Sequence, residues 1–428
     1  MRLLHVQNLE LKEFFEPSIP PYAILSHTWG SDEVTLQDLS QILKYSREGL
    51  HHTPEATAGY RKIEQACKQA EKDGFRWAWV DTCCIDKTSS AELSEAINSM
   101  FRWYQNSAIC YAYLSDVEDG DVLRAADSSF RQSRWFTRGW TLQELLAPDK
   151  VIFFSKSWVT IGDLRSLYDI VEDITRISSE YLLGRSVLSA SVSQKMAWAS
   201  RRTTTRLEDM SYCLLGMFNV NMPLLYGEGG KAFIRLQQEI IEVSNDQTLF
   251  IWGFGHDSTE TSPQDNLSGE PKLLATSPSD FTGCENIVQC NAWVPKRVAS
   301  FEMTKTGLRI ELPLVLCQIP DSENDRQILG LLNCRPSYEP DKLLAIPLGR
   351  PFPRRDTTWV LRKTLPANSI LSSKPYKVQR FPQYSIRLVP ASSLWEATFV
   401  SLSINSTRPF KDARFAGEVL PGRHTPGR

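Results

Sequence analysis

The amino-acid sequence predicts an α/β protein with a parallel sheet, followed by a second domain rich in β-strands. In the first half, apolar runs of strand length alternate with amphipathic stretches of helix length. The second half is rich in proline: of the 24 prolines, 6 lie in residues 1–258 and 18 lie in the remainder. A proline-poor half suits packed helices and strands, whereas a proline-rich half suits short strands joined by turns.

Four runs in the first half are apolar throughout and have the length of strands. They are YAILSHTW (22–29), FRWAWVDTCCI (75–85), AICYAYLSDV (108–117) and KVIFFSKSW (150–158). Strands that are apolar on both faces are typical of a parallel sheet that helices cover on both sides. Such sheets bind ligands beyond the carboxyl ends of their strands.

Two helices are predicted between these strands. In residues 59–74 apolar side chains recur on one helical face, and Gly74 is a typical helix stop. In residues 89–106, Ser89 and Glu92 have the spacing of a capping box, which predicts a helix start. The apolar face of the first helix comprises Tyr60, Ile63, Cys67 and Ala70.

The second half follows a polar segment without periodicity. Helices at residues 207–220 and 230–246 are expected to close the first domain, and residues 256–272 are predicted to be a linker. Strand-like runs then predict an antiparallel β-rich domain over residues 273–405, and residues 406–428 are expected to form a disordered tail. These runs include GLRIELPLVL, ILGLLNC, TTWVLRK and YSIRLVP.

Composition excludes several classes of protein. The chain has 428 residues, enough for two or three domains, and a net charge of −2, which does not suit a general nucleic-acid binder. No apolar window is long enough to span a membrane, and the N-terminus has no signal-peptide core, so we expect a cytoplasmic protein. The 9 cysteines form no CxxC pair, which favours reduced core thiols and no metal site.

Polar residues gather where the first two predicted strands end. The first strand ends in the residues Ser26, His27, Trp29 and Gly30. Asp81, at the end of the second, could bind ribose hydroxyls or simply cap the following turn. The tryptophans near strand ends, Trp29, Trp135 and Trp140, are either core residues or platforms on which a nicotinamide or adenine ring stacks.

Glu144 lies in the segment SRWFTRGWTLQELLAP and has two interpretations. Thr141 and Glu144 have capping-box spacing, so the glutamate could be a helix-start residue. Alternatively, a carboxylate in an aromatic cleft could stabilise a developing positive charge, as in glycosyl transfer. Desolvation by Trp135 and Trp140 would raise its pKa and permit proton transfer.

Two weaker hypotheses concern other reactive groups. His27 with Cys83 or Cys84 could form a Cys–His nucleophile, although thiols in an apolar run are usually buried and inert. The arginine-rich run SRRTTTR (200–206) could dock a phosphate, or be a solvated face paired with acids.

With these motifs placed, the chain resembles the fungal heterokaryon-incompatibility (HET) domain family. The matching blocks are YAILSHTWG, EVTLQDL, GYRKIEQACKQAEKDGFRWAWVDTCCIDK, SRWFTRGWTLQELLAP and ASRRTTTRLEDMSYCLLGMFNVNMPLLYGEGGKAFIRLQQEII. The resemblance covers about residues 1–250. One departure is Lys87, where many members have Gln.

The resemblance implies a fold and a site. HET domains look like distant relatives of TIR domains, which implies a flavodoxin-like sheet over about residues 20–160 and a helical extension over about 161–250, within a HET domain of residues 1–255. In catalytic TIR domains a W-C-L-x-E-L-like segment carries the glutamate that cleaves NAD, and Glu144 occupies that position here. Thr141 stands where that segment has cysteine.

The implied function is that of an effector in fungal non-self recognition and programmed cell death. Its chemistry would be NAD(P)⁺ cleavage with Glu144 catalytic, with NAD(P)⁺ as substrate and no cofactor. The residues that line the nucleotide-binding site would be Ser26, His27, Trp29, Gly30, Asp81 and Trp140. We expect self-association, and an incompatibility or receptor protein as a partner. The alternative is a non-catalytic signalling module that recruits cell-death partners.

Overall fold

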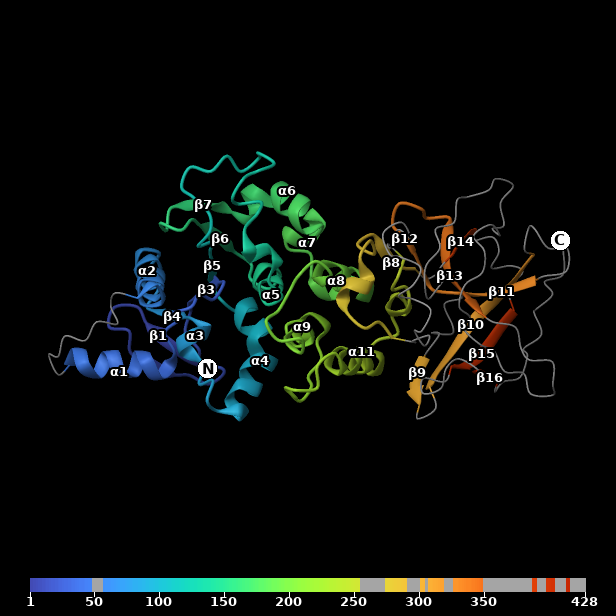
Figure 1. Cartoon of the computed structure of the whole chain (residues 1–428), viewed down its shortest axis with the longest axis horizontal. Helices are drawn as coiled ribbons and strands as arrows, with labels where there is room; N and C mark the ends of the chain where they lie inside the picture. The colour runs from blue at the N-terminus through green and yellow to red at the C-terminus, as the bar shows by residue number, and fades with distance from the viewer. Residues whose placement is uncertain are drawn as a thin grey trace. The chain divides into compact units, whose positions relative to one another are not determined.

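The structure of the protein is a computed structural model. It describes residues 1–47, 57–254, 274–290, 301–304, 307–318, 326–348, 387–390, 398–404 and 413–415 (Figure 1). The chain divides into two compact units. The first comprises residues 1–189 and 202–232, and the second comprises residues 190–201 and 233–428. The domain boundary expected near residue 255 stays a prediction, and the predicted linker at 256–272 lies outside the described residues.

A seven-stranded sheet organises the first unit, in the order β2-β1-β4-β3-β5-β6-β7. Its central strands β4, β3, β5 and β6 pair in parallel, and the outer strands β1, β2 and β7 pair antiparallel. The α/β class and the parallel core are confirmed, but the complete sheet is mixed. The bounds are β1 Arg2–His5, β2 Leu11–Glu13, β3 Ala23–His27, β4 Trp77–Trp79, β5 Ile109–Tyr113, β6 Val151–Phe154 and β7 Thr160–Asp163.

The outer strands escaped the sequence prediction because they are short and partly exposed. β2 and β7 have exposed or half-buried residues at every position, so they contain no apolar run. By contrast, all five residues of β3 are buried. Successive strand residues point to opposite faces, so complete burial means that both faces of the sheet are covered at β3.

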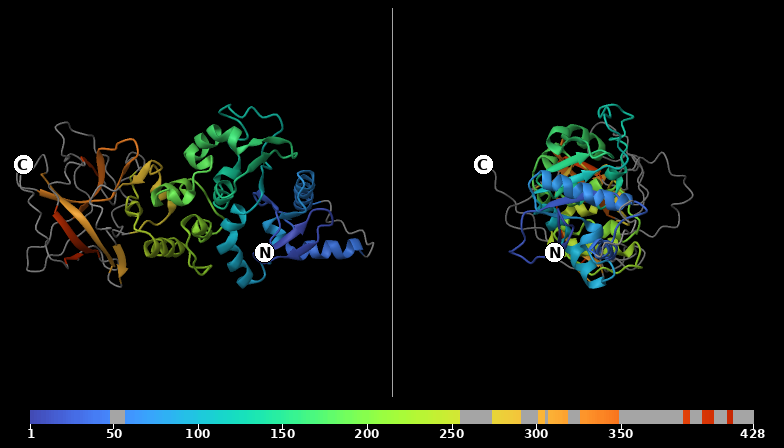
Figure 2. Two further views of the ribbon diagram at one scale, coloured as in Figure 1. Left: turned by 180° about the vertical axis from the view of Figure 1, so that it is seen from behind. Right: turned by 90° about the vertical axis from the view of Figure 1, so that its left-hand side faces the viewer.

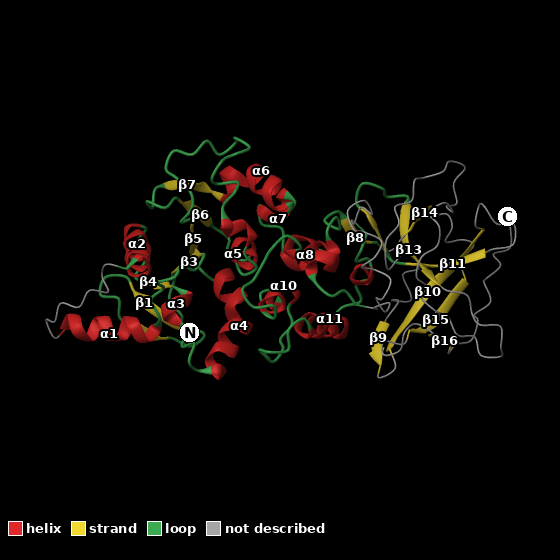
Figure 3. Ribbon diagram, in the orientation of Figure 1, coloured by secondary structure: helices red, strands yellow, loops and turns green. Residues whose placement is uncertain are grey.

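Helices of the first unit connect and cover these strands, as Figure 3 shows in red. The α-helices are α1 Leu36–Arg47, α2 Ala58–Lys72, α3 Asp81–Cys84, α4 Ser90–Gln105, α5 Thr141–Leu146, α6 Leu164–Thr175, α7 Ser179–Leu182, α9 Asp209–Tyr212 and α10 Leu215–Phe218. Two 3₁₀ turns are η2 Arg134–Thr137 and η3 Val187–Ser189. The single helix predicted at 207–220 is therefore two short ones, α9 and α10.

Local sequence explains the two helices that were predicted best. On α2, Ile63, Cys67 and Ala70 are buried. The chain leaves this helix through Gly74, whose φ of 86° is costly for any residue with a side chain. On α4, the Ser89 hydroxyl accepts from the N–H of Glu92 at 3.3 Å, so the predicted N-cap is confirmed.

The predicted strand 75–85 is wrong in its second half. β4 ends at Trp79, and Asp81 opens the short helix α3. An acid in the first turn favours a helix start because it faces the unpaired N–H groups there. Asp81 still follows a strand, but it lies on a helix and not on a strand end.

The strand order determines where a ligand would bind. From β3 the chain moves to β4 on one side and then to β5 on the other, so the chain order reverses between β3 and β5. In open α/β sheets the crevice for ligands lies at such a reversal, beyond the carboxyl ends of the strands. Ser26 and His27 end β3 at this place, and α5 packs against β3 (Figure 1).

The second unit is dominated by antiparallel strands, drawn in orange and red in Figure 2. One sheet has the order β14-β13-β11-β10-β15-β16 with β9 on β10, and a smaller one pairs β12 with β8. The predicted antiparallel pairing is confirmed within the described residues; the run TTWVLRK lies outside them, and β16 lies in the expected tail. The strands are β8 Ile287–Gln289, β9 Phe301–Thr304, β10 Gly307–Gln318, β11 Arg326–Leu331, β12 Cys334–Pro336, β13 Lys342–Leu348, β14 Arg387–Pro390, β15 Thr398–Ile404 and β16 Ala413–Phe415.

Helical elements of the second unit precede these strands. They are α8 Val192–Ala199, most of α11 Lys231–Val243, and the 3₁₀ turns η4 Gln247–Phe250 and η5 Pro278–Phe281.

The packing of α10 on α4 predicts how far an added methyl group at Gly216 destabilises the fold. A Cβ at Gly216 would lie 2.0 Å from the Cβ of Phe101, so Gly216→Ala should lower the free energy of unfolding by about 1–3 kcal/mol. Gly230→Ala is the matched control, because nothing lies within 4 Å of its added Cβ; it should change stability by less than about 0.5 kcal/mol. Urea unfolding of the three proteins measures both; equal midpoints for the two variants would contradict this packing.

Candidate functional site

Three buried side chains from separate elements meet beside the end of β3. The Trp135 indole N–H donates to the Ser26 hydroxyl oxygen at 2.8 Å, and the Ser26 hydroxyl donates to the Glu144 carboxyl. An indole N–H can only donate, so it fixes the serine oxygen as the acceptor and leaves the hydroxyl proton for the carboxyl. We call Ser26, Trp135 and Glu144 the Ser–Trp–Glu cluster.

Burial controls the charge of this cluster. Ser26 and Trp135 are fully buried, and Glu144 is 7% exposed. Burial raises the pKa of Glu144 to about 8; Asp81 raises it further, whereas the hydroxyls of Ser26 and Tyr104 and the charge of Arg202 oppose the rise. The carboxyl therefore keeps its proton through most of the neutral range. Its rise in pKa agrees in direction and cause with the expected desolvation.

The capping-box interpretation of Glu144 is wrong. Trp140 is the N-cap of α5, and Thr141 is already inside the helix. The Thr141 hydroxyl donates to the carbonyl of Trp135, and the Glu144 carboxyl accepts from Ser26. The two side chains thus serve tertiary contacts, because their partners lie on other elements.

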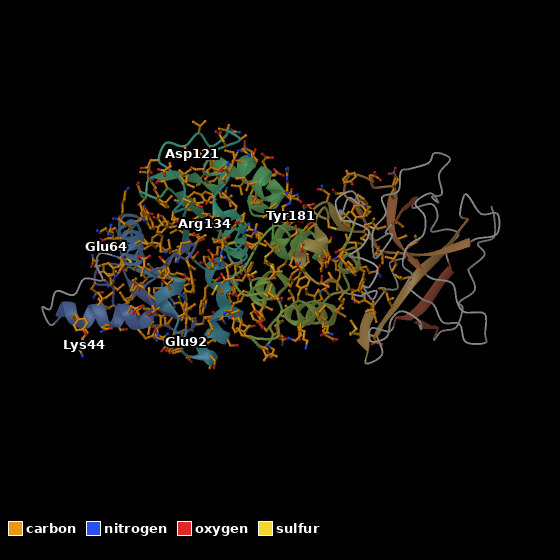
Figure 4. All side chains as sticks on the ribbon, in the orientation of Figure 1. Lys44, Glu64, Glu92, Asp121, Arg134 and Tyr181 are labelled. Atoms are coloured by element: carbon orange, nitrogen blue, oxygen red, sulfur yellow. The ribbon has the colours of Figure 1, made fainter. Side chains whose placement is uncertain are left out.

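Trp135 is placed by the turn that precedes it. Ser133 caps η2, since its hydroxyl accepts from the N–H of Trp135 at 3.3 Å. The carboxylate of Asp116 holds this cap, accepting from the Ser133 hydroxyl at 2.7 Å and from the N–H of Arg134 at 2.9 Å. Arg134 is labelled in Figure 4, in the first unit. The sequence S-R-W thus fixes the indole that orients Ser26.

The arginine-rich run 200–206 holds the loop before α5. The Arg202 guanidinium donates to the carbonyl of Arg138 at 2.8 Å and to the Thr141 hydroxyl at 2.9 Å, and Thr203 pairs with Thr137 by a backbone bond of 2.7 Å. Arg202 is 5% exposed, so the prediction of a solvated face is wrong for this residue. Its hydrogen-bond partners are groups of the protein itself. Burial lowers the pKa of Arg202 to about 10, whereas Glu144 acts in the opposite direction.

A second group of charged and aromatic residues surrounds His27. Its Nε2 lies 3.6 Å from Asp81 Oδ1 and 3.8 Å from Glu33 Oε2, and within the described residues neither ring nitrogen makes a hydrogen bond. Burial and the charge of Lys62 lower the pKa of His27 to about 3, so the imidazole is neutral. Glu33 also accepts from the N–H of Gly30 at 2.7 Å, which ties the loop after β3 to His27.

Trp29 belongs to the same group. Its indole N–H donates to Asp81 at 2.8 Å, and the Nζ of Lys87 lies 3.6 Å from the centroid of its ring. The departure from the family pattern noted at Lys87 therefore makes a specific contact. We call Trp29, Asp81 and Lys87 the Trp29 platform.

The structure does not support a Cys–His nucleophile of His27 with Cys83 or Cys84. Cys83 and Cys84 are 0% and 3% exposed, and the hydrogen bond with Cys84 together with burial raises the pKa of Cys83 well above its usual range. A nucleophile must be a thiolate, and the neutral buried His27 offers no cation to stabilise one. Both thiols are core side chains.

Trp140 interacts with Asp209, at the start of α9. It is half-buried, and its indole lowers the pKa of Asp209, which burial otherwise raises. Asp209 also accepts from the Tyr226 hydroxyl at 2.9 Å. The residue that orients Ser26 is therefore Trp135, whereas Trp140 interacts with Asp209.

A cavity of about 340 Å³ lies next to Glu33, and Glu144 does not line it. Its walls are Asp32, Glu33, Val34, Asp38, Gln41, Ile42, Tyr45 and Thr57. The Ser–Trp–Glu cluster is enclosed, because Ser26 and Trp135 are fully buried and Glu144 is 7% exposed. A ligand could contact Glu144 only after the residues that cover it rearrange.

Sequence reasoning missed two residues that act on the candidate site. Arg202 influences Glu144 electrostatically, and Tyr104 donates from α4 to the Leu25 carbonyl at 3.0 Å beside it. No short-range spacing links either residue to Glu144. Only the concentration of three arginines among small hydroxyl residues in SRRTTTR indicated a special position.

Over the described residues, no helix combines the length and apolar character that crossing a membrane requires. Within the same part of the chain, no three His, Cys, Asp or Glu side chains come together as ligands for a metal ion.

Comparison with known proteins finds a family match within the first unit. Residues 22–131 match the family described as heterokaryon incompatibility protein (HET), and residues 231–346 match a domain of unknown function (DUF8212). The chain is 49% identical over 236 residues to the vegetative incompatibility protein HET-E-1 of Podospora anserina. That alignment covers 54% of this chain and 17% of the relative. No solved structure matches the chain.

The resemblance to the HET family is thereby confirmed for residues 22–131. Ser26, His27, Trp29 and Asp81 fall inside this range. Glu144 lies beyond its end, so its assignment depends on the geometry around it.

The raised pKa of Glu144 predicts a pH-dependent stability. The folded protein holds this proton up to about pH 8, whereas the unfolded chain releases it near the ordinary pKa of 4.5. Between these values the unfolded state binds fewer protons, so the stability of the wild type falls as pH rises, by at most about 1.4 kcal/mol per pH unit from this group. Glu144→Gln has no ionisable carboxyl at this position and should gain stability relative to wild type from pH 5 to 8.

The measurement is urea unfolding at several pH values. Glu64→Gln is the control, because Glu64 lies on the surface of α2 with 40% of its side chain exposed (labelled in Figure 4). Its stability should follow wild type across the range. Parallel curves for wild type and Glu144→Gln would show that Glu144 ionises normally in the folded protein.

Proposed function

We propose that the HET domain at residues 22–131, together with the segment that carries Glu144, acts in heterokaryon incompatibility by cleaving NAD(P)⁺ to nicotinamide and ADP-ribose products. The observation that carries this proposal is the buried Glu144 carboxyl, held by Ser26 beside the reversal of strand order. The similarity to HET-E-1, a vegetative incompatibility protein, supports the biological role.

The reaction requires stabilisation of a positive charge. As the bond between nicotinamide and ribose breaks, its electrons leave with the nicotinamide, and the ribosyl carbon becomes cation-like. A carboxylate fixed in a buried position stabilises such a charge more strongly than one in water. Water then adds to the ribosyl carbon and releases a proton, which gives the ADP-ribose product.

The proton on Glu144 is part of the proposal. A neutral carboxyl stabilises a cation poorly, so the residue must ionise when substrate binds. The nicotinamide ring of NAD(P)⁺ carries a positive charge, and a nearby positive charge lowers the pKa of a carboxyl. Substrate would thus create the carboxylate that acts on it, and the hydrogen bond from Ser26 would favour the ionised form.

The remaining residues would bind the dinucleotide. Asp81 follows β4 at the carboxyl edge of the sheet, where an acid can accept from ribose hydroxyls. Trp29, which is 50% exposed, offers an accessible ring for stacking. His27 and Gly30 shape the loop between them through Glu33, and Trp140 would form an outer wall of the opened site.

The fold fits this proposal. The order β4-β3-β5-β6 is the order 2-1-3-4 in chain sequence, as in the first four strands of flavodoxin-like sheets. This agrees with a TIR-related domain, the relationship that the sequence motifs suggested. Because Glu144 is enclosed here, we propose that self-association opens and completes the site, and that dilute protein is weakly active.

The alternative function is a non-catalytic module that recruits partners in cell death. The enclosure of Glu144 favours it, because a side chain that is 7% exposed contacts substrate only after a rearrangement. In that case the Ser–Trp–Glu cluster would serve to fix α5 against β3. The two functions predict different outcomes for one substitution.

Glu144→Gln should abolish NAD(P)⁺ cleavage and leave the fold intact. Gln matches the neutral carboxyl in shape but never ionises, so we expect turnover to fall about a hundredfold or more. Nicotinamide release by concentrated protein measures this, with Glu64→Gln as the variant expected to keep full activity. Equal turnover in wild type and Glu144→Gln would remove Glu144 from the chemistry.

The same assay distinguishes the alternative and tests the protonation argument. No turnover in any variant, with self-association confirmed by light scattering, would favour the recruiting module. In an active protein, kcat/KM should rise with pH towards a plateau above about pH 8, because kcat/KM reports the ionisation of the free protein. A profile that is flat from pH 6 to 9 contradicts a carboxylate with this pKa.

A further inference from the structure

The Trp29 platform holds a positive charge on an aromatic face. Lys87 lies just after α3, and Trp29 lies just after β3. The ammonium nitrogen of Lys87 is 3.6 Å from the centroid of the Trp29 ring, well inside the range of about 6 Å for cation–π attraction. Tryptophan is the best side chain for such contacts, because its ring face is the most electron-rich.

A carboxylate strengthens the platform. Asp81 accepts the indole N–H of Trp29 at 2.8 Å. This hydrogen bond polarises the indole toward its ring, because hydrogen-bonded groups polarise one another in a low dielectric. The carboxylate also adds its own negative charge beside the ring. Aromatic faces bind organic cations by cation–π attraction, and a carboxylate beside the face adds Coulombic attraction.

The ammonium group of Lys87 occupies this site, although burial disfavours its charged form. Burial lowers the pKa of Lys87, and the charges of Asp81 and Glu33 act against that lowering. The lysine is thus partly desolvated and compensated by the platform, as a bound cationic ligand would be. Trp29 is nevertheless 50% exposed, so a solute can reach the ring.

We propose that the Trp29 platform is a binding site for a flat organic cation and that Lys87 is its internal competitor. This inference rests on the proposed function, in which the cation is the pyridinium ring of the oxidised dinucleotide. The binding face in this proposal is the one that Lys87 covers, because that face already holds a cation, so stacking there requires the Lys87 side chain to leave. Lys87 then weakens substrate binding at rest and keeps the site occupied.

Sites for a neutral ring, for a phosphate and for a cation predict different effects of removing Lys87. A site for a neutral aromatic ring would bind oxidised and reduced nicotinamide alike, and removing Lys87 would affect both equally. A site for phosphate would depend on the charge of Lys87, so removing it would weaken binding. A cation site held by Lys87 predicts a gain for the cation alone.

The test is calorimetric titration of the full chain with two probes of nearly equal shape. 1-Methylnicotinamide is a cation, and 1-methyl-1,4-dihydronicotinamide is neutral. In Lys87→Gln the dissociation constant of the cation should fall about tenfold, and that of the neutral probe should change less than about twofold. Lys44→Gln is the control, since Lys44 is an exposed residue on α1 (labelled in Figure 4), and it should bind as wild type does.

A double variant confirms the location. Lys87→Gln combined with Trp29→Ala should lose the gain, whereas a gain that persists without Trp29 would overturn the proposal. Unchanged or weaker binding of the cation in Lys87→Gln, including binding too weak to detect at tens of millimolar, would also overturn it. A thermal melt of each variant must match wild type, so that loss of fold is recognised.

Binding of these probes does not depend on turnover. A gain in cation binding without NAD(P)⁺ cleavage by wild type would support the cation site and contradict the proposed enzyme. Cleavage by wild type without that gain would support the enzyme and place its nicotinamide elsewhere.

Discussion

The hydroxyl of Ser26 is the contact on which the candidate site depends. It accepts from the indole of Trp135 and donates to Glu144, so one oxygen joins a strand, a turn and a helix that are distant in sequence. Because the indole fixes the direction of the hydroxyl, the carboxyl receives a donor that cannot rotate away. Removing that hydroxyl would take a hydrogen bond from each of two buried polar groups, the indole N–H and the carboxyl, at a cost of about 1–3 kcal/mol each.

Burial and partial compensation give Glu144 its chemical character. A fully compensated carboxylate would ionise early and persist as an ordinary structural pair, whereas an uncompensated one would never ionise. Here Ser26, Tyr104 and the charge of Arg202 offset only part of the effect of burial. The result is a carboxyl close to its ionisation point in the neutral range, where the arrival of a cation can change its state. The Trp29 platform shows the same principle, because a desolvated cation is balanced by Asp81.

Much of the fold could be predicted because its signals are local. The apolar face of α2, the N-cap at Ser89 and the apolar strands β3, β5 and β6 follow from spacing within a few residues. The short outer strands, with their exposed residues, carry no such signal. The site divides in the same way: spacing identified Glu144 as special but favoured a capping box as strongly as a cleft. Its partner Ser26 lies 118 residues away, and only the folded sheet brings the two together.

The most direct test of this description is the ionisation of Glu144 itself. Carbon-13 NMR of protein labelled at the glutamate carboxyl carbon can follow it, with the Glu144 signal identified by its absence from Glu144→Gln. We predict a titration midpoint near pH 8 in wild type and a higher one in Ser26→Ala, which loses the hydrogen bond that favours ionisation. A midpoint near the ordinary 4.5 in wild type would contradict the description, because the carboxylate would then be ionised at neutral pH without any ligand.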